Sequence, residues 1–203
     1  MTETQLQPAT ELQPATVIFR RPTKDDAIAL ASQRFLAGER VEMGALAADL
    51  GISRTTLYRR VGERDQLLGE VIASAVDHWT QAVERDAEGT GVDRFLDAFS
   101  RYLRLTAAFE PLTELTVREP QLALRLLNDP DGPVTLRSRE NAARVLAESA
   151  PELEVPPSVI EAIVTTAIAT VWTQIAIGHE PDVDRALYVT RLLVLACEQG
   201  LAR

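Results

Sequence analysis

The chain has 203 residues, of which 46% are hydrophobic and 25% charged, and its net charge is −9. This composition is ordinary for a soluble globular protein with one or two domains, and a single cysteine excludes an internal disulfide. The negative charge is unevenly distributed along the chain, because residues 1–68 hold nine basic and nine acidic residues and have no net charge. The whole excess of negative charge therefore lies in residues 69–203, which favours a two-part architecture.

A polar arm, residues 1–22, precedes the first predicted helix. The pentapeptide LQPAT occurs in it twice, and so short a proline-bearing repeat buries too little apolar surface to fold alone. The arm lacks the basic start and apolar run of a secretory signal peptide, which predicts a cytoplasmic protein. We therefore expect a flexible arm followed by folded units at residues 23–68 and 69–203.

The first helix is expected to begin after Thr23. Thr23 and Asp26 approximate a capping box, in which each side chain binds the other residue's backbone N–H. Ile28, Ala31 and Phe35 share one face and should form a small core with the helices that follow.

Two short helices separated by a glycine turn form the most informative stretch of the chain. Residues 43–50 and 53–60 are predicted to be helical, and Gly51 stands between them. Gly62 ends the second helix, and a long helix is predicted from about residue 64 to residue 87. This is the helix-turn-helix pattern, whose second helix can lie in the major groove of DNA.

The second helix of the pair carries hydrogen-bond donors and no acid. Ser53 is a good N-cap, and Leu57 and Val61 are spaced to anchor the helix to its own core. Arginine can bind guanine O6 and N7, and threonine can contact a thymine methyl group or a phosphate. The expected DNA contacts, including basic residues of the arm and of two helix starts, are Arg54, Thr55, Thr56, Tyr58, Arg59, Arg60, Arg64, Lys24, Arg20 and Arg21.

This stretch resembles the TetR family of transcriptional regulators. The matching residues are Leu46-Ala47, Leu50-Gly51-Ile52-Ser53, Thr56-Leu57-Tyr58 and Arg64-Asp65-Gln66-Leu67-Leu68. Glu42 stands where the family usually has a capping threonine, Val61 where it has an aromatic residue, and Arg64 where it has lysine. The resemblance implies a DNA operator, a small-molecule effector bound in the second unit, and a homodimer.

Further helices are expected after the long one, which makes the predicted fold all-α. Glycine and proline bound them, at residues 92–109, 111–118, 120–128, 134–149, 158–177 and 182–201. On the helix 134–149 we place Leu136, Ala143, Leu146 and Ala147 toward the core.

The last two helices are the most apolar. The helix 158–177 has large apolar residues on one side and small residues on the other, yet Glu161, Gln174 and several threonines make it too polar to span a membrane. A helix that is apolar on two sides must be covered on two sides. We expect a four-helix bundle with a second copy of the chain, as TetR-like proteins form, with interface residues Ala162, Thr166, Ala169, Leu192 and Ala196.

Aromatic residues gather on the helices that surround the effector cavity in TetR-like proteins. Ordinary core packing explains any one of them equally well. With two polar side chains added, the expected pocket residues are Trp79, Phe95, Phe99, Tyr102, Phe109, Arg118, Trp172 and Thr173. A surface ion pair explains Arg118 equally well.

Patterns for catalysis or metal binding are missing from the sequence. His78 and His179 are the only histidines, and neither has a partner at a zinc-binding spacing. There is no glycine-rich phosphate loop, nucleophile elbow or pair of catalytic carboxylates. We therefore expect no enzyme activity, no cofactor and no metal, and we expect Cys197 to be a buried, reduced thiol.

The sequence thus predicts a homodimeric, cytoplasmic transcriptional regulator, most often a repressor in this family, that an effector releases from a palindromic operator. Residues 35–40, 61–64 and 67–71 resemble a TetR-like subgroup that controls the degradation of quorum-signal lactones, which implies a lactone-like effector. The alternative is an all-α small-molecule-binding or enzymatic dimer whose helix-turn-helix no longer reads DNA.

Overall fold

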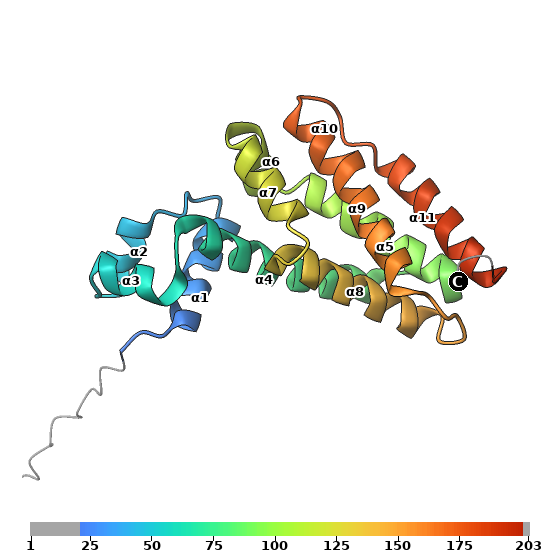
Figure 1. Ribbon diagram of the computed structural model, residues 1–203, viewed down its shortest axis with the longest axis horizontal. Helices are drawn as coiled ribbons and strands as arrows, with labels where there is room; N and C mark the ends of the chain where they lie inside the picture. The colour runs from blue at the N-terminus through green and yellow to red at the C-terminus, as the bar shows by residue number, and fades with distance from the viewer. Residues whose placement is uncertain (1–20, 201–203) are drawn as a thin grey trace, which may run out of the picture.

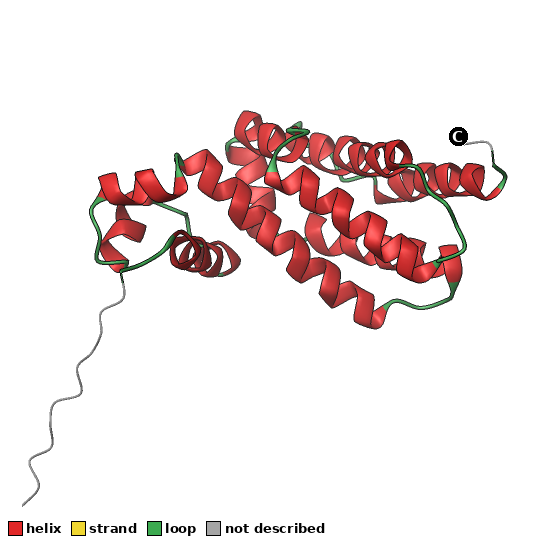
Figure 2. Ribbon diagram, turned by 60° about the horizontal axis from the view of Figure 1, so that its bottom comes forward, coloured by secondary structure: helices red, strands yellow, loops and turns green. Residues whose placement is uncertain are grey.

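Helices joined by short loops build the protein, and the all-α prediction is confirmed. The computed structural model describes residues 21–200, which contain no strand (Figure 2). The helices are α1 (Lys24–Leu36), α2 (Met43–Asp49), α3 (Arg54–Val61), α4 (Arg64–Asp86), α5 (Gly91–Ala107), α6 (Glu110–Arg118), α7 (Pro120–Asn128), α8 (Pro133–Ser149), α9 (Pro157–Ala167), η1 (Ile168–Trp172), α10 (Thr173–Ala176) and α11 (Val183–Glu198).

Local side-chain chemistry sets the bounds of the first helices. The capping box of α1 is present, with the Asp26 backbone N–H donating to Thr23 Oγ1 at 3.2 Å and the Thr23 N–H donating to the Asp26 carboxylate at 2.6 Å. Ser53 caps α3 by accepting from the Thr56 N–H at 3.2 Å. Gly51 and Gly62 have φ of 63° and 75°, a backbone conformation that glycine adopts at little cost. They therefore end α2 and α3 sharply enough for the helix-turn-helix.

Helix α4 is a rod that joins the two ends of the molecule (Figure 1). At about 1.5 Å per residue it spans roughly 34 Å. Its first turns bury Leu67 and Leu68 beside α1, and its last turns bury Trp79 and Val83 among α5 and α8. One rigid element therefore enters both the helix-turn-helix unit and the larger helical domain.

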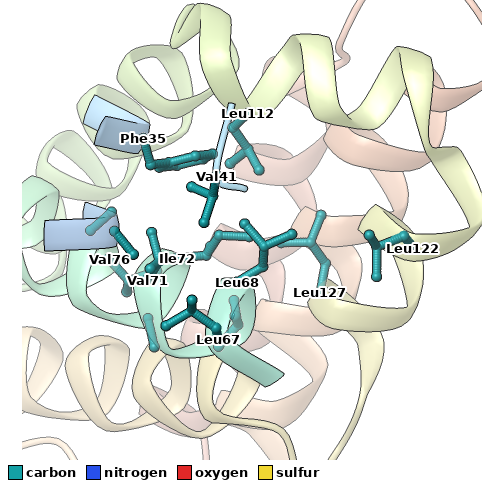
Figure 3. Packing of buried hydrophobic residues seen from close by; sticks show 14 of the residues in the cluster. Phe35, Val41, Leu67, Leu68, Val71, Ile72, Val76, Leu112, Leu122 and Leu127 are labelled. Carbon is teal, nitrogen blue, oxygen red and sulfur yellow. The ribbon is translucent and has the colours of Figure 1, made fainter. Parts of the chain in front are cut away.

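A continuous apolar core crosses the junction between these two parts. Phe35 and Val41 come from the helix-turn-helix side, and Leu112 and Leu127 come from α6 and α7 (Figure 3). They gather around Leu68 and its neighbours on α4, and all of these side chains are buried. Because the junction is a packed core, the two parts are coupled through apolar contacts.

The expected core face of α8 is largely wrong. Leu136 is 45% exposed, and Ala143 and Ala147 are exposed as well, although Leu146 is buried as expected. The buried face follows Val134 and Val145 instead, because α8 is held between α4 on one side and α9 on the other. Local spacing alone did not fix the rotation of this helix.

The helix expected at 158–177 is interrupted by the π-helical segment η1. Thr170 lies in this segment, and its backbone carbonyl accepts from the Asp182 N–H at 2.9 Å, outside the helix. By length and composition Pro157–Ala176 could cross a membrane, but half of it is buried inside the protein. Segments of π-helix recur at functional sites, and this one borders the cavity described below.

Candidate functional site

Helix α3 presents an exposed cationic surface at one end of the molecule. Arg54, Thr55 and Arg59 are exposed, and Tyr58 is 38% exposed. Helix α3 contains no acid, and neither of these two arginines forms an ion pair with any described residue. The Arg54 guanidinium lies over Gly44 of α2, where a β-carbon would come within 2.5 Å of its Nη2 atom.

Three other predicted DNA contacts have partners within the protein. Thr56 shares a hydrogen bond of 2.9 Å with the Ser53 hydroxyl, so it belongs to the cap of α3. Arg60 donates to the backbone carbonyl of Pro22, just before α1. Lys24 pairs with Glu70 at 2.8 Å. Arg21 is exposed, and Arg20 lies outside the described residues.

Arg64, which we expected to contact a DNA phosphate, is bound instead by a residue of the larger helical domain. Its Nη1 and Nη2 atoms donate to the two carboxylate oxygens of Glu119 at 2.8 and 3.0 Å, and its Nε atom donates to the Val41 carbonyl at 3.3 Å. The hydrogen bond from Arg64 holds the pKa of the Glu119 carboxyl below its ordinary value. A phosphate contact by Arg64 therefore requires competition with Glu119.

A cavity of about 80 Å³ lies in the second domain, between α4, α5, α8, α9 and η1. Five of the eight predicted pocket residues line it, namely Trp79, Phe95, Phe99, Tyr102 and Trp172. The Phe95 and Phe99 rings stack with centroids 5.8 Å apart and form one wall. The structure therefore brings together side chains that are up to 93 residues apart in the chain.

The remaining three predicted pocket residues do not line this cavity, which corrects that expectation. Arg118 is a surface residue that pairs with Glu114 at 3.3 Å, and Thr173 faces elsewhere at the start of α10. Phe109 lies between the cavity wall and α1. Its ring makes edge-to-face contacts with Trp79 at 5.1 Å and with Phe35 at 5.7 Å.

Polar cavity residues of α8 were missed by the sequence analysis. Ser138 and Asn141 line the same cavity as Tyr102, and so does Glu84 of α4. Polar residues on a helix ordinarily indicate a solvated face, so nothing in the sequence distinguished them. Their place in the lining depends on the rotation of α8, which differs from the rotation expected from the sequence.

The predicted interface residues lie on α9, η1 and α11, which pack side by side (Figure 1). Ala169 is exposed, Leu192 is 49% exposed, and Ala162, Thr166 and Ala196 are partly buried. Tyr188 on α11 is 65% exposed, and Ile177, just after α10, is 60% exposed, so large apolar side chains are exposed on and near these helices. A groove between these helices is lined in part by Thr166 of α9, Ala169 of η1 and Val189 of α11.

Two other expectations concern reactive groups. Cys197 is a free and buried thiol, as expected, and burial raises the pKa of that thiol. Within residues 21–200, no cluster of three or more histidine, cysteine or acidic side chains could hold a metal ion.

Comparison with known proteins places the chain in a family. Residues 90–195 match the family model described as the tetracyclin repressor-like C-terminal domain. The structure is similar to that of the transcriptional repressor QsdR of R. erythropolis, from the TetR family, with 31% sequence identity, a TM-score of 0.78, and 89% of this chain and 95% of that chain covered.

A second solved structure shares the fold. It is the TetR family repressor AlkX from Dietzia sp. strain DQ12-45-1b, implicated in biodegradation of n-alkanes, at 21% identity and a TM-score of 0.55, with 91% of this chain and 100% of that chain covered. No curated protein matches the chain. The family model covers more than half of the sequence, and the chain therefore belongs to the TetR family of transcriptional regulators.

Proposed function

We propose that the protein is a homodimeric repressor that leaves a palindromic operator when a small molecule enters the cavity between α4, α5 and α8. TetR-family repressors bind DNA operators and small-molecule effectors and act as dimers. The observation that carries the proposal is the position of α4. Its first residue follows the cationic helix α3, and its last turns line the cavity.

DNA reading is assigned to the exposed residues of α3. Arg54 and Arg59 are free to contact base edges or phosphates, and Tyr58 is partly exposed beside them. The excess acidity of residues 69–203 opposes DNA binding elsewhere on the surface. A dimer would present two such helices to successive major grooves of a near-palindromic site.

Effector response is assigned to the contacts between cavity and helix-turn-helix. A cavity of about 80 Å³ is smaller than the roughly 300 Å³ at which ligand pockets usually begin, so an effector must displace its walls. Trp79 is one of these walls, and Phe109 connects it to Phe35 of α1. An effector that favours the displaced arrangement lowers operator affinity by its differential affinity for the two arrangements.

Selection from random DNA duplexes, followed by fluorescence anisotropy on the selected duplex, tests the DNA-binding part. We expect the affinity of the wild-type protein to fall steeply with salt, with a slope of about −0.9 per phosphate contacted. Arg54→Ala and Tyr58→Ala should each weaken binding by roughly 5-fold to 150-fold, because a good base contact contributes about 1–3 kcal/mol.

Arg85→Ala is the matched control, since Arg85 is an exposed arginine near the far end of α4. It should leave the operator affinity unchanged. Selection of no sequence, or affinity that does not depend on salt, would leave the alternative of a small-molecule-binding dimer with a vestigial helix-turn-helix.

The lactone-like effector stays a proposal that rests on the resemblance of residues 35–40, 61–64 and 67–71 to one subgroup of the family. Purified acyl-homoserine lactones, added to the complex with the selected duplex, test it by release of the DNA. Release by the lactone and not by its ring-opened acid would support a lactone as the effector.

A further inference from the structure

Two threonine hydroxyls in the cavity lining already have hydrogen-bond acceptors within the protein. Thr80 donates to the Val76 carbonyl at 2.8 Å, and Thr106 donates to the Leu103 carbonyl at 3.2 Å. Each hydroxyl therefore satisfies its hydrogen bond within its own helix.

The carboxylate that lines the cavity is paired with an arginine. Both oxygens of Glu84 accept from Arg144 at 2.8 Å, and Arg144 also pairs with Glu148. This pair raises the pKa of the Arg144 guanidinium further above its ordinary range, so the arginine stays charged. Glu84 therefore offers no unpaired negative charge to a cationic ligand.

One polar corner remains, where α5 and α8 meet. The Tyr102 phenol and the Ser138 hydroxyl share the cavity lining there, and burial raises the pKa of Tyr102 above the ordinary value, so the phenol stays neutral. Asn141 lies in the same lining and donates to Asp77 at 2.9 Å. A neutral hydroxyl pair and an amide can exchange hydrogen bonds with an uncharged ligand group, but they cannot compensate a buried ion.

From this arrangement we infer that the cavity takes uncharged, largely apolar molecules with one hydrogen-bonding group, which meets Tyr102 and Ser138 while the apolar body lies among the aromatic side chains. The inference rests on the proposed function, because it names the ligand class of the effector cavity. It excludes carboxylates and ammonium compounds as ligands, since no lining residue carries an unpaired charge.

Three probes that differ only in the charge of one end test the inference directly. They are 1-octanol, octanoate and octylammonium, which at pH 7 are neutral, negative and positive. The whole chain contains two tryptophans, Trp79 and Trp172, and both line the cavity. Intrinsic tryptophan fluorescence of the full-length protein therefore reports on the cavity itself, without DNA.

We expect 1-octanol to change the tryptophan emission with an affinity at least tenfold higher than that of either charged probe. Adjacent positions on α8 provide a matched pair of variants. Ala142 lines the cavity and Ala143 is exposed. Ala142→Leu should fill the space and abolish the response to 1-octanol, whereas Ala143→Leu should keep the wild-type affinity.

Tyr102→Phe is a second variant, and it removes only the phenol oxygen. It should weaken 1-octanol binding about threefold to tenfold, the effect of one ordinary hydrogen bond, and keep the preference over the charged probes. Circular dichroism confirms that each variant is folded before it is titrated.

Binding of octanoate or octylammonium as tight as that of 1-octanol would overturn the inference, and so would an unchanged response in folded Ala142→Leu. These outcomes leave the DNA-binding proposal intact, because no DNA is present. Conversely, selective binding of 1-octanol without release of the selected duplex would support the ligand class and contradict an effector role for that alcohol.

Discussion

Arg64, the first residue of α4, forms a two-pronged ion pair with Glu119, the residue between α6 and α7, with N–O distances of 2.8 and 3.0 Å. The two residues belong to the two parts of the molecule that α4 connects. A second pair, Arg125 with Asp65, joins the same two parts. The start of α4 is therefore fixed to the larger helical domain by charge as well as by apolar packing.

Replacing Glu119 by glutamine should lower the free energy of unfolding at pH 7 by about 0.5–1 kcal/mol. The value is small because the Glu119 and Arg64 side chains are 36% and 26% exposed, where ion pairs contribute little. The pKa of Glu119 is lowered from its ordinary value of 4.5, so its contribution is present above that value and is lost as the pH falls through the lowered pKa. Urea denaturation across this pH range should show the difference between wild type and variant disappear in acid.

The same variant should bind operator more tightly, because Arg64 no longer has a carboxylate that competes with phosphate. We expect the slope of log affinity against log salt to become steeper by about one contact. Glu114→Gln is the matched control, since Glu114 pairs with Arg118 within α6 and forms no ion pair with α4. An unchanged slope in Glu119→Gln would mean that Arg64 does not contact DNA.

Local patterns in the sequence predicted the elements well and the contacts between them poorly. The capping box at Thr23, the cap at Ser53 and the turn at Gly51 depend on neighbours within three residues, and each occurs as expected. The pairing of Arg64 with Glu119 joins residues 55 positions apart. No periodicity encodes such a pair, which is why Arg64 was assigned to phosphate alone.

The cavity was predicted in part for a related reason. Large aromatic residues such as Trp79 and Phe99 are typical both of hydrophobic cores and of cavity walls. Their positions in the sequence are therefore enough to predict that they are buried in this region. Phe109 fits that pattern equally well, yet it lies behind Trp79. Distinguishing the wall from the layer behind it requires the rotation of each helix, and for α8 that rotation depends on two neighbouring helices.

Phe109→Leu should separate effector binding from operator release. Leucine keeps an apolar contact but loses both edge-to-face ring contacts, to Trp79 and Phe35, so we expect a stability loss of about 1–3 kcal/mol. Effector affinity should stay within about threefold of wild type, because Phe109 does not line the cavity. The effector concentration that releases operator should rise well beyond that factor. Parallel shifts in affinity and release would show that Phe109 does not couple them.

Arg60 should contribute to DNA binding by positioning Arg21. Its guanidinium donates to the Pro22 carbonyl, and Pro22 follows Arg21 directly. Arg60→Ala and Arg21→Ala should each weaken operator binding, and the double variant should be little weaker than either single variant. Anisotropy titrations of all four proteins measure this coupling. Arg59→Ala combined with Arg21→Ala is the reference pair and should be additive. Additivity for Arg60 as well would assign it a DNA contact of its own.

If the proposed dimer forms through α9 and α11, Leu192→Glu should convert it to a monomer. Leu192 is 49% exposed on α11, beside the 65% exposed Tyr188, so this face leaves large apolar side chains in water unless a second copy covers them. A carboxylate at the centre of a two-fold interface meets its own copy and loses its hydration, which costs more than most interfaces can offset. Sedimentation velocity measures the change in mass.

The matched control is Leu136→Glu on α8, because Leu136 is 45% exposed and lies on a different helix. It should remain dimeric. A monomer in the Leu136 variant and a dimer in the Leu192 variant would place the interface on α8 instead.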